Sequence, residues 1–184
     1  MGVPSPIGHA LAGVAAGWIV RGARLPSESG RDTWREVALF AALGMAPDLD
    51  LVVGLHSGPT HGLGMAVVAA GAAWMPGVAG AAAGRRTALA FACVLAYASH
   101  TLLDWLGTDT APPIGIMALW PCTREYYESG VHLFMGVSRE FRQPELFWWP
   151  NLATLTRELL VLAPVLGVVF WLRRRPGQAP TIRD

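Results

Sequence analysis

Ala46-Pro47-Asp48-Leu49-Asp50, followed by His56 and His61, is the stretch from which the rest of the chain is interpreted. It places two carboxylates and two imidazoles within a short segment of a chain that is otherwise mostly Ala, Gly, Val and Leu. A second cluster, Ser99-His100-Thr101-Leu102-Leu103-Asp104, repeats the same chemistry further along. Carboxylate oxygen and imidazole nitrogen are together the ligands that Zn²⁺, Mn²⁺ and Fe²⁺ favour. We therefore expect the two clusters to meet at a metal site.

The composition favours a membrane protein. Of the 184 residues, 53% are hydrophobic and 15% are charged, against roughly 25% charged in an average soluble domain. The mean hydropathy is +0.39. The length suits one domain, 1–184. All basic residues are Arg, and the net charge of +1 identifies no partner by itself. We expect membrane lipid to be a partner of this protein, and we expect no nucleic-acid partner.

Apolar segments predict a small all-α, polytopic membrane bundle of about five helices. The expected helices cover residues 6–20, 34–45, 63–83, 87–106 and 152–172, with a loop at 48–62 and a long non-spanning region at 107–150. A spanning helix needs about 20 residues, so the first two expected helices are short. Trp120, Trp148 and Trp149 are expected at the membrane interface, where Trp is enriched.

The distribution of Arg predicts an orientation. Short cytoplasmic loops carry an excess of Lys and Arg, and Arg gathers at 21–35, at 85–86 and at 173–183. If these three regions face the cytoplasm, the C-terminus is cytoplasmic and His9, at the start of the first helix, faces outward. Both His/Asp clusters then fall at the same outer face. Arg bias and ligand position are independent features, and they agree on a multi-pass membrane protein with an outward-facing site.

The spacing within each cluster suits metal binding. His100 and Asp104 are four residues apart, so on a helix they share one face. Asp48 and Asp50 flank a leucine, so one can ligate while the other orients an imidazole, and either is a candidate general base. Thr60 is expected to cap a helix that begins near His61.

Seven residues are candidate ligands, namely His9, Asp48, Asp50, His56, His61, His100 and Asp104. They suit one or two divalent ions, with zinc favoured and manganese or iron as alternatives. Two ions about 3.5–4 Å apart are an arrangement used for phosphoester hydrolysis. His132 and Cys122 are weaker candidates. Cys93 is expected in the core, and Glu125 and Glu128 in solvent.

Five motifs in fixed order resemble the YdjM-like family of bacterial inner-membrane, metal-dependent hydrolases. They are Gly8-His9, Pro47-Asp48-Leu49-Asp50, His56-x-Gly58-x-Thr60-His61, Ser99-His100-x-x-x-Asp104, and Leu119-Trp120-Pro121 with Arg124 after it. The resemblance implies a helical membrane protein with hydrolase activity. Ser57 stands where the family often has Arg, and Gly62 where it has Ser, which implies another substrate preference. The His-x-x-x-Asp pattern is more loosely similar to all-helical zinc phospholipases C.

We therefore expect a hydrolase that cleaves an amphipathic or phosphorylated small molecule, such as a phospholipid-like phosphoester, at the outer face. Asp50 or Asp48 would take a proton from water activated by the metal. Two alternatives remain open at this point. One is a metal-binding transporter or sensor without hydrolysis. The other is a structural protein whose His/Asp pairs only fasten its helices together.

Overall fold

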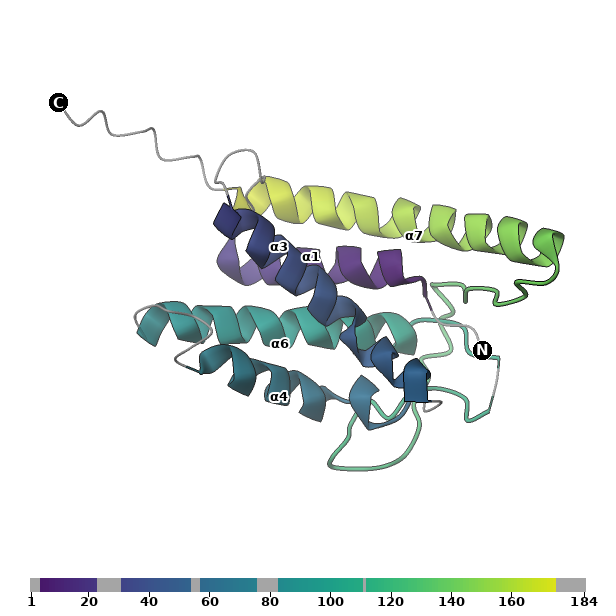
Figure 1. The fold of residues 1–184 in the computed structure, drawn as a ribbon, viewed down its shortest axis with the longest axis horizontal. Coiled ribbons are helices and arrows are strands. Elements are labelled where there is room, and N and C mark those ends of the chain that lie inside the picture. Colours follow the sequence, from purple (N-terminus) through teal and green to yellow (C-terminus); the bar gives the residue numbers. More distant parts are fainter. Residues whose placement is uncertain (1–3, 23–30, 54–56, 76–82, 111, 175–184) are drawn as a thin grey trace.

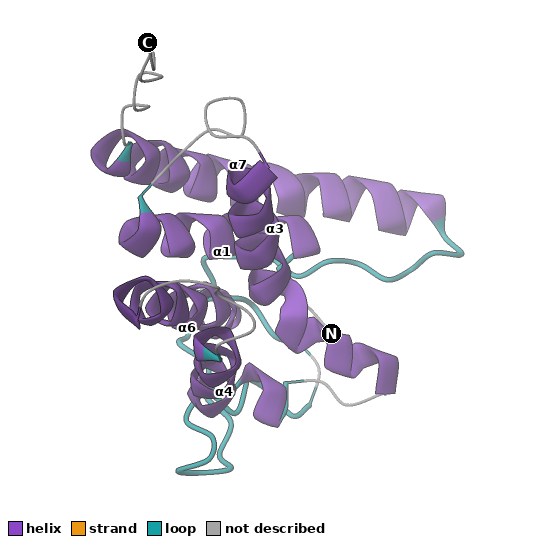
Figure 2. Ribbon diagram, turned by 60° about the vertical axis from the view of Figure 1, so that its left-hand side comes forward, coloured by secondary structure: helices purple, strands orange, loops and turns teal. Residues whose placement is uncertain are grey.

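The computed structural model describes residues 4–22, 31–53, 57–75, 83–110 and 112–174, and these residues form a helical bundle (Figure 2). Its elements are α1 (Pro6–Arg21), α3 (Arg31–Met45), the 3₁₀ segments η1 (Ala46–Val53) and η2 (Pro59–His61), α4 (Leu63–Trp74), α6 (Ala83–Trp105) and α7 (Pro144–Arg173). Two isolated β bridges join described residues, Gly107 with Phe134 and Ile116 with Tyr127. The prediction of an all-α bundle of about five helices is confirmed.

Helix α1 lies at the centre of the bundle. It packs against α3, α6 and α7, while α4 packs against α6 (Figure 1). Successive helices run in alternating directions, so the start of α1, the end of α3 and the end of α6 lie at one end of the molecule, together with the starts of α4 and α7. We call this the site end. The chain thus returns its two His/Asp clusters to one place.

Glycines allow α1 and α3 to approach closely. A Cβ atom on Gly13 would lie 2.3 Å from the carbonyl oxygen of Phe40, and one on Gly44 would lie 2.3 Å from the carbonyl oxygen of His9. Phe40 is fully buried beside Val14 in the hydrophobic core between the helices. Small residues at such crossings are typical of helix pairs in membranes.

Two helices in the described part of the chain, α6 from Gly84 onward and α7, are long and apolar enough to cross a membrane. At 1.5 Å per residue the 30 residues of α7 extend about 45 Å. Only 11% of its most apolar stretch is buried, so Leu160 and Trp171 are among many large side chains that face outward. Helices α1, α3 and α4 are shorter, and the 12 residues of α4 extend about 18 Å.

Several expected boundaries were wrong. Helix α7 begins at Pro144 and not at 152, because proline suits a first helical turn and Pro150 is accommodated inside the helix. Trp148 and Trp149 therefore lie on that helix, with 67% and 70% of their surface exposed. Helix α6 covers Ala83–Trp105 and so begins four residues before the expected start at 87. Residues 48–53 are 3₁₀-helical and not loop. Helix α4 ends at Trp74, and residues 76–82 of its expected range lie outside the described residues.

Candidate metal centre

The site end holds six of the seven candidate ligands, which come from four separate elements. His9 lies in the first turns of α1, Asp48 and Asp50 lie on η1, and His61 ends η2. His100 and Asp104 lie in the last turns of α6. The three histidines are fully buried, and the side chain of Asp104 is 1% exposed. His56 lies outside the described residues.

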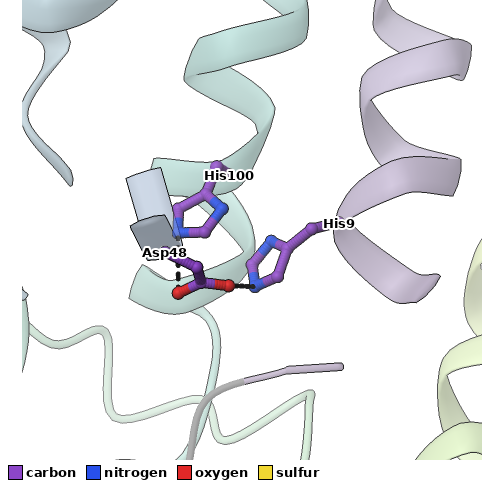
Figure 3. Close-up of side chains that lie close together, drawn as sticks. All are labelled: His9, Asp48 and His100. Atoms are coloured by element: carbon purple, nitrogen blue, oxygen red, sulfur yellow. Dashed lines mark ion pairs between the residues drawn. The ribbon is translucent and has the colours of Figure 1, made fainter. Parts of the chain in front are cut away.

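Three imidazole rings and two carboxylates converge in this centre. Nε2 of His100 lies 2.9 Å from Oδ2 of Asp104, and Nε2 of His61 lies 3.4 Å from the same oxygen. Nε2 of His9 lies 3.3 Å from Oδ1 of Asp104. Asp48 turns one carboxylate oxygen toward His100 at 3.8 Å and the other toward His9 at 4.0 Å (Figure 3). Oδ1 of Asp48 also lies 3.7 Å from Nε2 of His61.

These separations suit donors around a cation. Ligands at about 2.1 Å from a tetrahedral ion lie about 3.4 Å from one another. Two overlapping groups, His9–Asp48–His100 and His61–His100–Asp104, each present ligand atoms that lie within 4.8 Å of one another. The rings of His9 and His100 stack with their centroids 3.8 Å apart, which holds their nitrogens side by side.

The tautomer of His100 follows from its backbone partner. Its Nδ1 lies 2.7 Å from the carbonyl oxygen of Gly44, so Nδ1–H donates this hydrogen bond. The Nε2 lone pair then faces the carboxylates and can bind one cation. Both groups of donors include His100, and its one free nitrogen can bind only one ion. The two groups together therefore suit a single ion better than two.

Asp50 holds His61 from the opposite side of its ring. Oδ2 of Asp50 lies 3.3 Å from Nδ1 of His61 and accepts a hydrogen bond of 2.6 Å from the hydroxyl of Thr60. The ring is thereby oriented so that Nε2 points at Asp48 and Asp104. A carboxylate behind a ligating imidazole is a recurrent support in metal sites. The geometry therefore separates the two acids, with Asp48 among the converging donors and Asp50 behind His61.

Neighbouring hydroxyl groups fix the backbone of η2. The hydroxyl of Thr101 donates to the carbonyl oxygen of His61, and that of Tyr97 donates to the carbonyl oxygen of Thr60, both at 2.7 Å. Thr60 does not cap α4 as expected, because the residue at the N-cap position is Gly62, which has no side chain to bond. The hydroxyl of Thr60 instead donates its hydrogen bond to Asp50.

The charges at the centre depend on one another. Burial opposes ionisation of Asp48, but contacts with His61, His100 and His9 outweigh burial and hold the pKa of the Asp48 carboxyl below its usual value. Burial likewise opposes charge on His61, yet side-chain contacts with Asp48 and Asp50 and the charge of Asp104 raise the pKa of His61 to about 9. Buried carboxylates facing imidazole lone pairs need positive charge between them, as protons or as a metal ion. One divalent cation would neutralise Asp48 and Asp104.

Several buried atoms in the centre lack a hydrogen bond. Among the described residues they include Nε2 of His9 and His100, Oδ1 of Asp48 and both carboxylate oxygens of Asp104. Leaving a buried polar group unsatisfied costs about 1–3 kcal/mol. All of these atoms face the same small volume, and coordination to one ion would satisfy them together. The donor set of imidazole nitrogen and carboxylate oxygen therefore fits a zinc-like cation.

The weaker candidates lie apart from the centre. The side chain of His132 is 49% exposed and faces Oε1 of Glu128 at 3.6 Å. Cys122 is exposed, whereas Cys93 is buried in the helical core, as predicted. Glu125 is exposed, but the carboxylate of Glu128 is 21% exposed and accepts a hydrogen bond from the backbone of Asp109.

The two departures from the family motifs occupy tight positions. Ser57 is 3% exposed and has a positive φ of 62°. A long side chain such as Arg would find little room there. A Cβ atom on Gly62 would lie 2.8 Å from the Cβ of Trp120, because residues 117–120 pass close to the start of α4.

Sequence reasoning missed two residues that support the centre. Gly44 carries the carbonyl group that binds His100, and a lone glycine in a helical stretch gave no sign of it. Glu158 is fully buried on α7 and contacts the start of α1. A signal for Glu158 did exist, since an acidic residue within an apolar helix is costly and usually has a purpose.

Comparison with known protein families identifies a family of membrane proteins. The model of one family, described as YdjM inner membrane protein, matches residues 5–176. No curated protein matches the chain, and no solved structure does.

Proposed function

Because the chain belongs to the YdjM inner membrane protein family, we propose that it is a membrane-bound, metal-dependent hydrolase. Its substrate would be an amphipathic phosphoester, such as a phospholipid-like molecule, cleaved at the membrane surface. One observation carries the proposal. The imidazoles of His9, His61 and His100 converge with the carboxylates of Asp48 and Asp104 in a buried volume at one end of the bundle.

These five residues would supply the ligands of the ion, with zinc favoured by the kind of donors. When bound, such an ion polarises a phosphoryl oxygen and lowers the pKa of a coordinated water toward about 7. His100 and His61 are already oriented for it by Gly44 and Asp50. The chain therefore loses little conformational entropy in assembling these two ligands when the ion binds.

Asp48 is the acid best placed to meet substrate. Its side chain is 15% exposed, against 4% for Asp50 and 1% for Asp104. Water and a phosphoester would therefore approach along Asp48, which can accept a proton from the attacking water. Asp50 would act indirectly by keeping the ring of His61 in place.

An apolar groove next to the centre supports a lipid-like substrate. It has a volume of about 360 Å³ and lies between α4, α6 and the segment after α6. Its walls include Leu63, Ala98, Thr101 and Leu119. Thr101 follows His100 directly and also bonds the carbonyl oxygen of His61. An alkyl chain in this groove would place its polar head beside the His/Asp centre.

We further propose that the protein crosses the membrane several times, with the site end outward. In support, Arg21, Arg85 and Arg173 lie at the helix ends remote from the centre. This matches the usual excess of arginine on the cytoplasmic side.

Metal content measured by elemental mass spectrometry tests the proposal. We expect about one equivalent of zinc, manganese or iron in detergent-purified wild type, its loss in His100→Ala and its retention in His132→Ala. Phosphodiester and phosphomonoester substrates with one alkyl chain would then be assayed with that metal. Wild type that stays metal-free after incubation with each ion would overturn the proposal.

A further inference from the structure

Glu158 is an acidic residue in the interior of α7, and it is fully buried. Ionisable side chains inside apolar membrane helices are rare, costly and usually functional. Most of the surface of α7 is exposed, so burial of this carboxylate reflects a specific contact rather than general packing. That contact is with the first residues of α1.

The carboxylate of Glu158 accepts from both hydrogen-bond donors of Ser5. The backbone N–H of Ser5 donates to Oε1 at 2.5 Å, and the hydroxyl of Ser5 donates to Oε2. Ser5 is also the N-cap of α1, since its side-chain oxygen accepts from the backbone N–H of Gly8 at 3.1 Å. Gly8 leaves space for the acid, because a Cβ atom there would lie 2.8 Å from the Cδ of Glu158.

Ser5, which Glu158 holds, is in turn linked to His9 by one backbone hydrogen bond. The backbone N–H of His9 donates to the carbonyl oxygen of Ser5 at 3.1 Å, which closes the first turn of α1. On its other side, the carbonyl group of His9 lies against Gly44. A negative charge at a helix N-terminus is also favourable to the helix dipole. The first turn of α1 is thus fixed by α7 on one side and by α3 on the other.

We propose that Glu158 is a positioning residue for the metal centre: by fastening Ser5, it sets the first turn of α1 so that Nε2 of His9 faces Asp104 and Asp48. The inference rests on the proposed metal site. It assigns to α7 a direct part in building a centre to which that helix contributes no ligand.

Thr154 offers a matched control on the same helix. It lies one turn before Glu158, is also fully buried, and donates a hydrogen bond to the carbonyl oxygen of Gly136 at 3.1 Å. Thr154→Val removes one side-chain hydrogen bond of α7 and leaves the Ser5–Glu158 contact in place. Any effect of general damage to α7 should therefore appear in this variant too.

The test is Co²⁺ binding by the full-length protein, followed by the visible spectrum of the bound ion. In Glu158→Leu we expect Co²⁺ affinity to fall about 10–100-fold, the range typical when a residue that supports a ligand is removed. The absorption bands should also change toward those of His9→Ala. Glu158→Gln can still accept from the Ser5 N–H and should stay within a few-fold of wild type. Thr154→Val should match wild type in both readouts.

The outcomes separate the two proposals. Wild-type affinity and spectrum in Glu158→Leu would overturn the positioning role and leave the metal site intact. Wild type that binds no Co²⁺ would overturn both. Should Glu158→Leu fail to fold, Gly8→Ala carries the test, because its added methyl group must displace the Glu158 carboxylate. A wild-type spectrum in a folded Gly8→Ala protein would then overturn the inference.

Discussion

The carbonyl oxygen of Gly44 accepts a hydrogen bond of 2.7 Å from Nδ1 of His100. The absence of a side chain at the same glycine lets α3 lie against the carbonyl group of His9. Gly44, which is not itself a proposed ligand, therefore affects two proposed ligands. Its carbonyl group sets the tautomer of His100, and its lack of a side chain sets how closely α3 approaches His9.

Gly44→Ala should weaken the metal centre although Gly44 is not a proposed ligand. The new Cβ atom would lie 2.3 Å from the carbonyl oxygen of His9, so α1 and α3 must move apart. Overpacking of this kind costs about 1–3 kcal/mol. We expect a lower melting temperature in detergent and weaker Zn²⁺ binding by isothermal titration.

The control for that variant is Gly71→Ala. Gly71 lies in the interior of α4, and an added methyl group there would meet no atom within 4 Å. Alanine favours a helix by up to about 1 kcal/mol over glycine, so stability should hold or rise slightly. Equal losses in the two variants would contradict the role assigned to Gly44.

Asp104 and Asp50 should differ in how strongly their removal affects metal binding. Asp104→Asn removes the carboxylate that all three imidazoles approach, and we expect stoichiometric metal to disappear. Asp50→Asn removes only the support behind His61, so metal affinity should fall about 10–100-fold while the stoichiometry is retained. Elemental analysis and competition with a chromophoric chelator measure the two effects. Complete metal loss in Asp50→Asn would make Asp50 a ligand.

Sequence patterns predicted the fold class because apolar runs of helical length are a strong signal. They predicted which clusters meet because His100 and Asp104 share a helical face and the alternating helices return both clusters to one end. They did not assign separate places to Asp48 and Asp50, which needs the turn geometry of η1. Nor did they find Glu158, whose partner lies at the other end of the sequence.

Proton and metal should compete at His61, with opposite effects of pH. Its pKa in the folded, metal-free protein is about 9, against an ordinary value of 6.5. The proton contributes stability below pH 6.5, and this contribution is lost as the pH rises through about 9. The melting temperature of metal-free protein should therefore fall over this interval.

Zn²⁺ needs the neutral imidazole, so its affinity should rise by up to about tenfold per pH unit between about pH 7 and 9. Melting curves with and without Zn²⁺ at about pH 6.5, 7.5 and 8.5 check both trends. His61→Ala should flatten them, and His132→Ala should leave them unchanged. A metal affinity that does not vary with pH would contradict the proposed role of His61 as a ligand.

Filling the apolar groove should affect long substrates selectively. Ala98 lines the groove, and Ala98→Phe would occupy part of its volume. Hydrolysis of a long-chain phosphoester should decline at least several-fold, with little change for a short, water-soluble one at the same metal content. Val67→Phe, at a position on α4 that is 65% exposed, serves as the control. Equal losses of activity on both substrates would contradict a role for the groove in binding alkyl chains.

The proposed ligands are distributed over the first 104 residues, and the helix that carries two of them is followed by α7. During synthesis, α1, α3 and α4 would therefore enter the bilayer before His100 and Asp104 have left the ribosome. The nascent chain would have no complete chelator until α6 is inserted, and α1 would gain its Glu158 contact only when α7 follows. If the proposed site takes up its ion, metal acquisition would be a late event in biogenesis and would report that the whole bundle has assembled.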